Sequence, residues 1–340
     1  MSNKYGSLSE LSAHLRKETI TIPLNEPPEI QKLRSTGYKF GAKSDAVTAM
    51  AALDDILRKA ANRWYRFLVA LNKRKITHQV VLSIYRCLEV PHAHSLGAMG
   101  LNKIADLAVN LSTLLQANAT RRGDTEKVIE EAIEAVAIFL AYLNQFVSWG
   151  HHWFPVPKVT ALADTRRGSN SYSPNLSRRI RVQDCPRVTL TWSLHDIDVT
   201  DAITIDKNPA LVRDIKIIAI LAVKENPALV RDFADALPFT VLVDQVVDSQ
   251  ASMRAYLPVV LMSVANVVES PRDAPPGQIR LSYGCELTIQ TGAGENDSCA
   301  PVLAEILETS WGDLYYVTRK VRRNMETKKR VITLTVELAN

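Results

Sequence analysis

The sequence predicts an α+β protein in which an N-terminal helical bundle is followed by a mixed α/β C-terminal domain. Before residue 150, apolar residues recur at three- and four-residue steps, as on one face of a helix. Beyond residue 187 they alternate with polar residues, as on a half-buried strand. A stretch rich in Arg, Ser and Asn separates the two patterns. We therefore divide the chain into an N-terminal arm (1–43), a helical domain (44–150), a basic flexible linker (151–186) and an α+β domain (187–340).

The expected arm begins with a short amphipathic piece, Ser9 to Lys17, and continues with TITIPL (residues 19–24). We expect TITIPL to be extended and the segment to contribute few core residues. Prolines and charges flank it. This composition predicts a segment that promotes self-association rather than stabilising its own subunit, so we expect a homo-oligomer.

The helical domain contains four expected helices, of which the first and third have an apolar stripe at helical spacing. Ser44 or Asp45 can cap the first helix, and Asp124 or Thr125 can cap the last. Gly150 is expected to stop the last helix. The four segments are 44–71, 77–88, the stripe from Leu101 to Leu115, and 124–150. The last helix is apolar nearly all round in its second half, so we expect it to be central.

The α+β domain contains several segments with strand-like alternation. We also expect LYYVTRKVRR (314–323) to pair with the final strand across NMETK. The motif NPALVRD occurs at 208–214 and again at 226–232, and its Asn as cap and Pro as first residue would start a helix each time. The other expected strands are RVTLTWSLHDIDV (187–199), DAITI (201–205), IRLSYGCELTIQT (279–291) and KRVITLTVEL (329–338).

The composition favours an intracellular, cytoplasmic protein that does not insert into a membrane. Its 340 residues, with 46% hydrophobic and 23% charged, are typical of globular domains. The four cysteines are scattered without a CxxC pair, which fits a reducing compartment. The first residues contain no apolar signal region, and the longest wholly apolar run, Ala135 to Leu143, is too short to span a bilayer.

The sequence carries no familiar catalytic motif, neither GxSxG nor GxxxxGK[ST]. The strongest metal candidate is CLEVPHAH, which places Cys87, His92 and His94 close together, with His151 and His152 as distant partners. Its spacing matches no zinc knuckle, finger or HExxH helix. We therefore expect no catalytic residues, no metal and no cofactor, and a protein that is not an enzyme.

A cluster of carboxylates leaves one alternative open. The segment LHDIDVTDAITID holds His195, Asp196, Asp198, Asp201 and Asp206. Alternating carboxylates on a strand can hold Mg²⁺, which would fit a component of an RNA-processing enzyme. The same alternation also makes an ordinary solvated strand edge, which we favour.

Positive charge is concentrated in three segments, although the net charge is only +5. Residues 58–75 hold seven basic and no acidic residues, residues 158–187 hold seven basic and two acidic, and residues 313–340 hold seven basic and three acidic. Clustered Lys and Arg bind phosphates with release of counterions. This segregation predicts a surface that binds a polyanion.

The predicted nucleic-acid contacts come from all three segments. The first places its basic residues on a helix opposite the apolar stripe, the second is the stretch RRGSNSYSPNLSRRIR (166–181), and the third is expected on a strand. Tyr65 and Tyr172 are expected to stack on bases. The full set is Lys59, Arg63, Tyr65, Arg66, Lys73, Arg74, Arg166, Arg167, Tyr172, Arg178, Arg179, Arg181, Arg319, Lys320, Arg322 and Arg323.

Because no motif for reading bases accompanies these clusters, we expect RNA binding that is largely indifferent to sequence. In organisation, with an arm and basic segments around two domains, the chain resembles the nucleocapsid and coat proteins of RNA viruses. The resemblance implies a self-assembling structural protein that holds single-stranded RNA in a basic groove, and a virion location if the source is viral. It carries over no functional residue, since no family motif matches. A helical adaptor that binds acidic proteins stays open as a further alternative.

Overall fold

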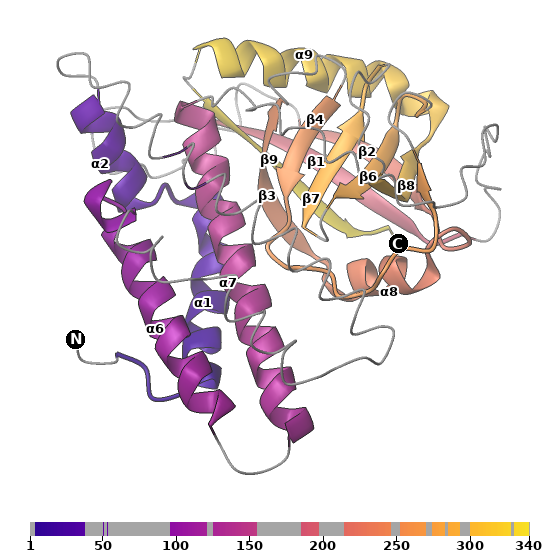
Figure 1. Ribbon diagram of the computed structural model, residues 1–340. Coiled ribbons are helices and arrows are strands. Elements are labelled where there is room, and N and C mark those ends of the chain that lie inside the picture. The colour runs from indigo at the N-terminus through magenta and orange to yellow at the C-terminus, as the bar shows by residue number, and fades with distance from the viewer. Residues whose placement is uncertain are drawn as a thin grey trace, which may run out of the picture.

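The computed structural model describes residues 4–37, 50, 53, 96–120, 125–154, 185–196, 214–245, 252–269, 274–282, 285–292, 300–327 and 330–339. The chain is mixed α+β, as predicted, with a group of helices beside an antiparallel β-barrel (Figure 1). The helices are α1 (Leu8–Thr21), η1 (Ile22–Leu24), α2 (Pro28–Gly37), α6 (Asn102–Ala119), α7 (Thr125–Trp153), α8 (Pro227–Asp235), η3 (Glu308–Ser310) and α9 (Trp311–Thr327). The strands are β1 (Arg187–Asp196), β2 (Ile215–Leu221), β3 (Phe239–Gln245), β4 (Ser252–Tyr256), β5 (Val268–Glu269), β6 (Gln278–Ser282), β7 (Glu286–Gln290), β8 (Ala300–Ile306) and β9 (Arg330–Leu338).

The barrel consists of eight antiparallel strands in the order β2-β1-β9-β3-β4-β7-β6-β8. The pairing of β2 with β8, where Ile220 lies opposite Glu305, closes the circle. The short strand β5 pairs with β8. Closure pairs the strand edges that an open sheet would expose, so the barrel is a firm support for the helices around it.

Side chains along the strands alternate between the barrel core and the outside. On β3, Val241 and Val243 belong to the core that the strands share with α8 and α9, whereas Leu242 packs with the N-terminal helices. On β4, Met253 belongs to the barrel core and Tyr256 to the helical core. The outer side of β3 and β4 is therefore the surface on which α7 packs.

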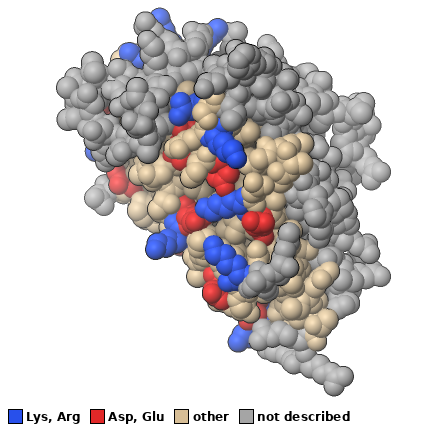
Figure 2. Space-filling model, turned by 90° about the vertical axis from the view of Figure 1, so that its left-hand side faces the viewer, with Lys and Arg blue, Asp and Glu red and all other residues tan. Residues whose placement is uncertain are grey.

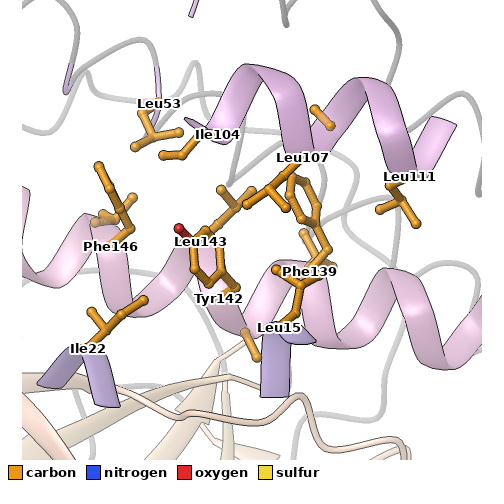
Figure 3. Packing of buried hydrophobic residues seen from close by; sticks show 14 of the residues in the cluster. Leu15, Ile22, Leu53, Ile104, Leu107, Leu111, Phe139, Tyr142, Leu143 and Phe146 are labelled. Carbon is orange, nitrogen blue, oxygen red and sulfur yellow. The ribbon is translucent and has the colours of Figure 1, made fainter. Parts of the chain in front are cut away.

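The helix α7 is central, as predicted, and lies between the other N-terminal helices and the barrel (Figure 1). Figure 3 shows Phe139 and Leu143 of α7 facing Leu107 of α6, with Leu15 of α1 nearby. The predicted stripe from Leu101 to Leu115 is buried. By length and composition alone α7 could cross a membrane, but 89% of its most apolar window is buried inside the protein, as in a core helix.

The end of α7 differs from the prediction. The helix does not stop at Gly150 but continues to Trp153, so the first residues of the predicted linker are helical. A Cβ at Gly150 would collide with the side chain of Met50, which is fully buried. The glycine is therefore explained by a close approach of two segments and not by a helix end.

The N-terminal segment also differs from the prediction. TITIPL is helical, because it ends α1 and forms η1. Leu11 and Leu15 are fully buried, and Trp149 Nε1 donates a hydrogen bond of 2.7 Å to the carbonyl oxygen of Ile22. The expectation of an extended segment with few core residues is wrong, since its apolar residues recur at helical spacing and pack against α7.

Two expected strands in the C-terminal half are also corrected. The alternating segment 279–291 forms two strands, β6 and β7, which pair with Ile279 opposite Ile289. The segment 314–323 is not a strand but most of α9, because its apolar residues are spaced for one face of a helix. Consequently β9 pairs with β1 and β3 instead. The strand predicted at 187–199 is confirmed as β1 over residues 187–196, and residues 197–199 lie outside the described residues.

The second copy of NPALVRD starts α8 as predicted, with Asn226 at the N-cap and Pro227 as the first helical residue. The Asn226 side chain makes no capping bond, and its Nδ2 donates to the carbonyl oxygens of Val267 and Val302 at 3.1 and 2.9 Å. Several predictions lie outside the described residues. They are the first copy of the motif except Asp214, the helix at 44–71 except residues 50 and 53, the helix at 77–88, the strand DAITI and residues 155–184 of the linker.

Candidate nucleic-acid interface

One apolar face holds α9 against the barrel. Leu314, Val317 and Val321 are buried in the barrel core, and their spacing places them on one side of the helix. Thr318 Oγ1 donates a hydrogen bond of 2.8 Å to the carbonyl oxygen of Leu314 and lies 3.8 Å from Sδ of Met253. In Figure 1 the helix lies across the top of the barrel. The opposite face of α9 is therefore held in one orientation, toward solvent.

The exposed face of α9 carries two tyrosines followed by basic residues. Tyr315 and Tyr316 are 46% and 49% exposed, and Arg319 and Lys320 are exposed as well. Residues four apart are neighbours on a helix, so Arg319 follows Tyr315 and Lys320 follows Tyr316 on this surface. Lys320 Nζ lies 5.2 Å from the centroid of the Tyr316 ring. The predicted strand would have placed Arg319 and Lys320 on opposite faces, whereas the helix exposes both.

Neither ion pairing nor the helix dipole explains these basic residues. Across the parts of the chain that the structure describes, Arg319 and Lys320 have no ion pair with a carboxylate. The macrodipole attracts cations within the last turn of a helix, and the last turn of α9 holds no basic residue. The two side chains therefore present positive charge that an anionic partner can neutralise.

The structure places only part of the predicted set of contacts. Arg319, Lys320 and Arg322 lie on the exposed side of α9, and the backbone of Arg323 belongs to the same helix. The others lie outside the described residues. They are Lys59, Arg63, Tyr65, Arg66, Lys73, Arg74, Arg166, Arg167, Tyr172, Arg178, Arg179 and Arg181.

The face made by the N-terminal helices has a different charge pattern. Figure 2 shows Lys and Arg interleaved with Asp and Glu over this face. Arg16 forms an ion pair with Glu134, and Lys103 Nζ lies 2.8 Å from Glu18 Oε2. Interleaved charges of opposite sign cancel at a distance, so this face lacks the single-sign field that attracts a polyanion. Among the described surfaces, α9 is the better candidate.

A buried polar cluster joins the barrel to α7, and the sequence analysis missed it. Asp244 on β3 lies opposite Arg254 on β4. Arg254 donates hydrogen bonds to Asp244 at 3.0 and 3.1 Å, and its Nη2 lies 2.8 Å from His151 Nδ1. All three side chains are buried. The sequence signal that could have found the pair is opposite charge at outward positions of two neighbouring strands.

The electrostatics of this cluster fit a structural role. Burial alone would raise the pKa of Asp244, but the Arg254 guanidinium and the His151 side chain lower it to about 2. Burial would lower the pKa of Arg254, but the Asp244 carboxylate raises it above its usual value. The cavity beside them is about 10 Å³, which is room for one water molecule at most. Within the described residues, the cluster is therefore an ion pair that joins β3 and β4 to α7 beside a cavity of that size.

The carboxylate alternative gains no support from the described residues. His195 is buried, and its Nε2 lies 2.8 Å from Thr333 Oγ1 on the neighbouring strand β9. Asp198, Asp201 and Asp206 lie outside the described residues. Within the described ranges, no three His, Cys, Asp or Glu side chains come together in a way that could hold a metal ion.

Comparisons with known proteins identify no family for the chain. No family model matches the sequence, and no curated protein matches it. Among solved structures, the chain is similar to the structure of McbB in complex with tryptophan, with 17% sequence identity and a TM-score of 0.34. The match covers 44% of this chain and 44% of that one, less than half of either.

Proposed function

We propose that the protein is a non-enzymatic, self-assembling structural protein of the nucleocapsid or coat type that binds RNA. It holds single-stranded RNA in a basic groove and does not read the base sequence. Clustered Lys and Arg bind the phosphate backbone of any sequence, because the binding free energy comes from counterion release. Its proposed location is the cytoplasm, and the virion if the source is a virus.

The observation that carries this proposal is the exposed face of α9. Arg319 and Lys320 have no ion-pair partner among the described residues, and Tyr315 and Tyr316 lie on the same face. Positive charge next to aromatic rings is the combination with which proteins bind single strands without sequence preference. The alternative functions gain no comparable support from a described surface.

The remainder of the proposed groove comes from segments outside the described residues. In this proposal, 44–150 is a helical domain, 187–340 is an α+β domain, and α7 lies at their interface. The basic faces of 59–74 and 319–323 line the groove. The segment that follows α7, up to residue 186, joins the domains and closes over the RNA through its arginines.

Self-assembly through residues 1–43 is the second part of the proposal. Since Leu11 and Leu15 belong to the core of their own subunit, contact with another copy must use the side chains left exposed. Ile20 and Leu24 are apolar, 70% and 38% exposed, and close together in sequence. We expect Ile20→Ser combined with Leu24→Ser to preserve the melting temperature and to lower the mass measured by light scattering. An unchanged assembly mass would exclude this contact.

The direct experiment is purification of the full chain without nuclease, followed by its ultraviolet absorbance spectrum and its mass in solution. We expect co-purified nucleic acid that ribonuclease removes and deoxyribonuclease does not. A variant with Arg319→Ser and Lys320→Ser should retain less of it. An adaptor for acidic proteins would instead purify free of nucleic acid, and an RNA-processing enzyme would cleave added RNA only with a divalent cation.

A further inference from the structure

The two exposed tyrosines of α9 form a feature that phosphate binding does not require. We propose that Tyr315 and Tyr316 are a stacking platform for unpaired bases, while Arg319 and Lys320 hold the adjacent phosphates. This inference rests on the proposed RNA binding and specifies its chemistry. The affinity of this surface then has two separable parts. Salt weakens the binding of phosphates, and it does not weaken the stacking of bases.

The spacing on the helix supports this division of roles. Each tyrosine is followed four positions later by a basic residue, so a ring and a cation form a neighbouring pair twice over. In one pair the cation already lies against the ring, with Lys320 Nζ 5.2 Å from the centroid of Tyr316. A nucleotide presents a base and a phosphate together. The surface offers a ring on which the base can stack and a cation that can bind the phosphate.

The packing of α9 against the barrel lowers the entropy cost of binding to the platform. Because Leu314, Val317 and Val321 are buried in the barrel core, the backbone that carries the rings is already ordered before binding. A tyrosine has only two side-chain torsions to fix when it binds. Binding therefore costs less conformational entropy here than it would on a loop.

The positive charge of α9 favours nucleic acid over another copy of the chain as the partner of this face. Two α9 faces packed against one another would bring the Arg319 and Lys320 side chains of both copies together, and like charges repel. A duplex would offer phosphates but keep its base faces stacked on each other. A single strand satisfies both halves of the surface, since its bases are free to stack on the rings.

The test compares wild type with Tyr315→Ala/Tyr316→Ala and with the matched control Tyr315→Phe/Tyr316→Phe. The probes are a labelled oligoadenylate and an abasic oligonucleotide with the same number of phosphates. We expect the alanine variant to bind oligoadenylate about 10-fold or more weakly, from the stacking contribution of one base or more. We expect it to bind the abasic probe like wild type, and the phenylalanine variant to bind both like wild type. Because both tyrosines face solvent, all three proteins should melt together.

The outcomes separate the inference from the function on which it rests. Equal binding of oligoadenylate by wild type and the alanine variant overturns the stacking platform and leaves phosphate binding in place. If wild type binds neither the oligoadenylate nor the abasic probe, RNA binding is overturned, and the stacking platform with it. If the alanine variant loses assembly mass while it keeps its affinity, the rings contact another copy of the chain and the inference is wrong.

Discussion

Arg254 donates two hydrogen bonds to Asp244, from Nε to Oδ1 at 3.0 Å and from Nη2 to Oδ2 at 3.1 Å. Both side chains are buried, and His151 of α7 adjoins the pair. Two consecutive strands and a helix about a hundred residues earlier in the chain thus share one ionic contact, at the point where the helices meet the barrel. A buried charge that loses its counter-charge destabilises the protein, because burial has removed its hydration.

We expect Asp244→Asn to destabilise the protein by about 3 to 5 kcal/mol, since it leaves Arg254 buried without its counter-charge. Replacing both residues, as Asp244→Leu with Arg254→Met, should cost less than the single change. Urea denaturation of the three proteins measures both values. A double variant that loses as much stability as Asp244→Asn, or more, would show that the residues do not act as a pair.

The same pair predicts a response to acid. The folded-state pKa of Asp244 is about 2, below its ordinary value of 3.8. Its stabilising contribution is therefore complete above pH 3.8 and is lost as the pH falls toward 2. The difference in unfolding free energy between wild type and Asp244→Asn should shrink over that window. A difference that stays constant with pH would contradict the assignment.

Glu26 predicts a pH dependence of opposite sign. Burial raises the pKa of Glu26 to about 7 from its ordinary 4.5, although Arg34, whose Nη2 lies 3.2 Å from Glu26 Oε2, opposes the shift. The folded state therefore gains stability from the protonated acid below pH 4.5 and loses it as the pH rises through 7. Relative to Glu26→Gln, wild type should lose up to about 3 kcal/mol across this window. Thermal unfolding of both proteins at several pH values measures it, and parallel curves would contradict it.

Gly150 gives a prediction about packing. Alanine normally stabilises a helix interior relative to glycine by about 0.5 to 1 kcal/mol. At this position the added methyl group meets the buried side chain of Met50, so we expect Gly150→Ala to destabilise the protein. In a Met50→Ala background the same change should become stabilising. A double-mutant cycle in denaturant measures the coupling, and additive effects would show that the two residues do not touch.

Sequence periodicity predicted the elements that are long and one-sided. The α6 stripe and the central place of α7 follow from apolar spacing over many residues, and β1 follows from clean alternation. Short or mixed patterns were less informative. In 314–323, the spacing of Leu314, Val317 and Val321 favours a helix, whereas the adjacent aromatic and β-branched residues favour a strand. The segment is helical because the helix buries these three apolar residues against the barrel.

The features that sequence reasoning missed depend on tertiary contacts that local sequence patterns do not show. Gly150 indicated a helix end because no local signal shows that Met50 packs on it. Asp244 and Arg254 meet only once β3 and β4 are paired. For the candidate interface, the sequence predicted the basic residues at 319–323, but only the helix shows that Arg319 and Lys320 lie beside two exposed tyrosines.

The most direct test of the proposed RNA binding is the slope of log affinity for a single-stranded oligoribonucleotide against log salt concentration. We expect a steep negative slope for wild type, and a slope flatter by about 1.4 for Arg319→Ser/Lys320→Ser, at roughly 0.7 per phosphate contact. Arg16→Ser/Lys103→Ser, on the face with mixed charges, is the matched control and should keep the wild-type slope. Absence of binding by wild type, or equal slopes for wild type and the α9 variant, would contradict the proposal.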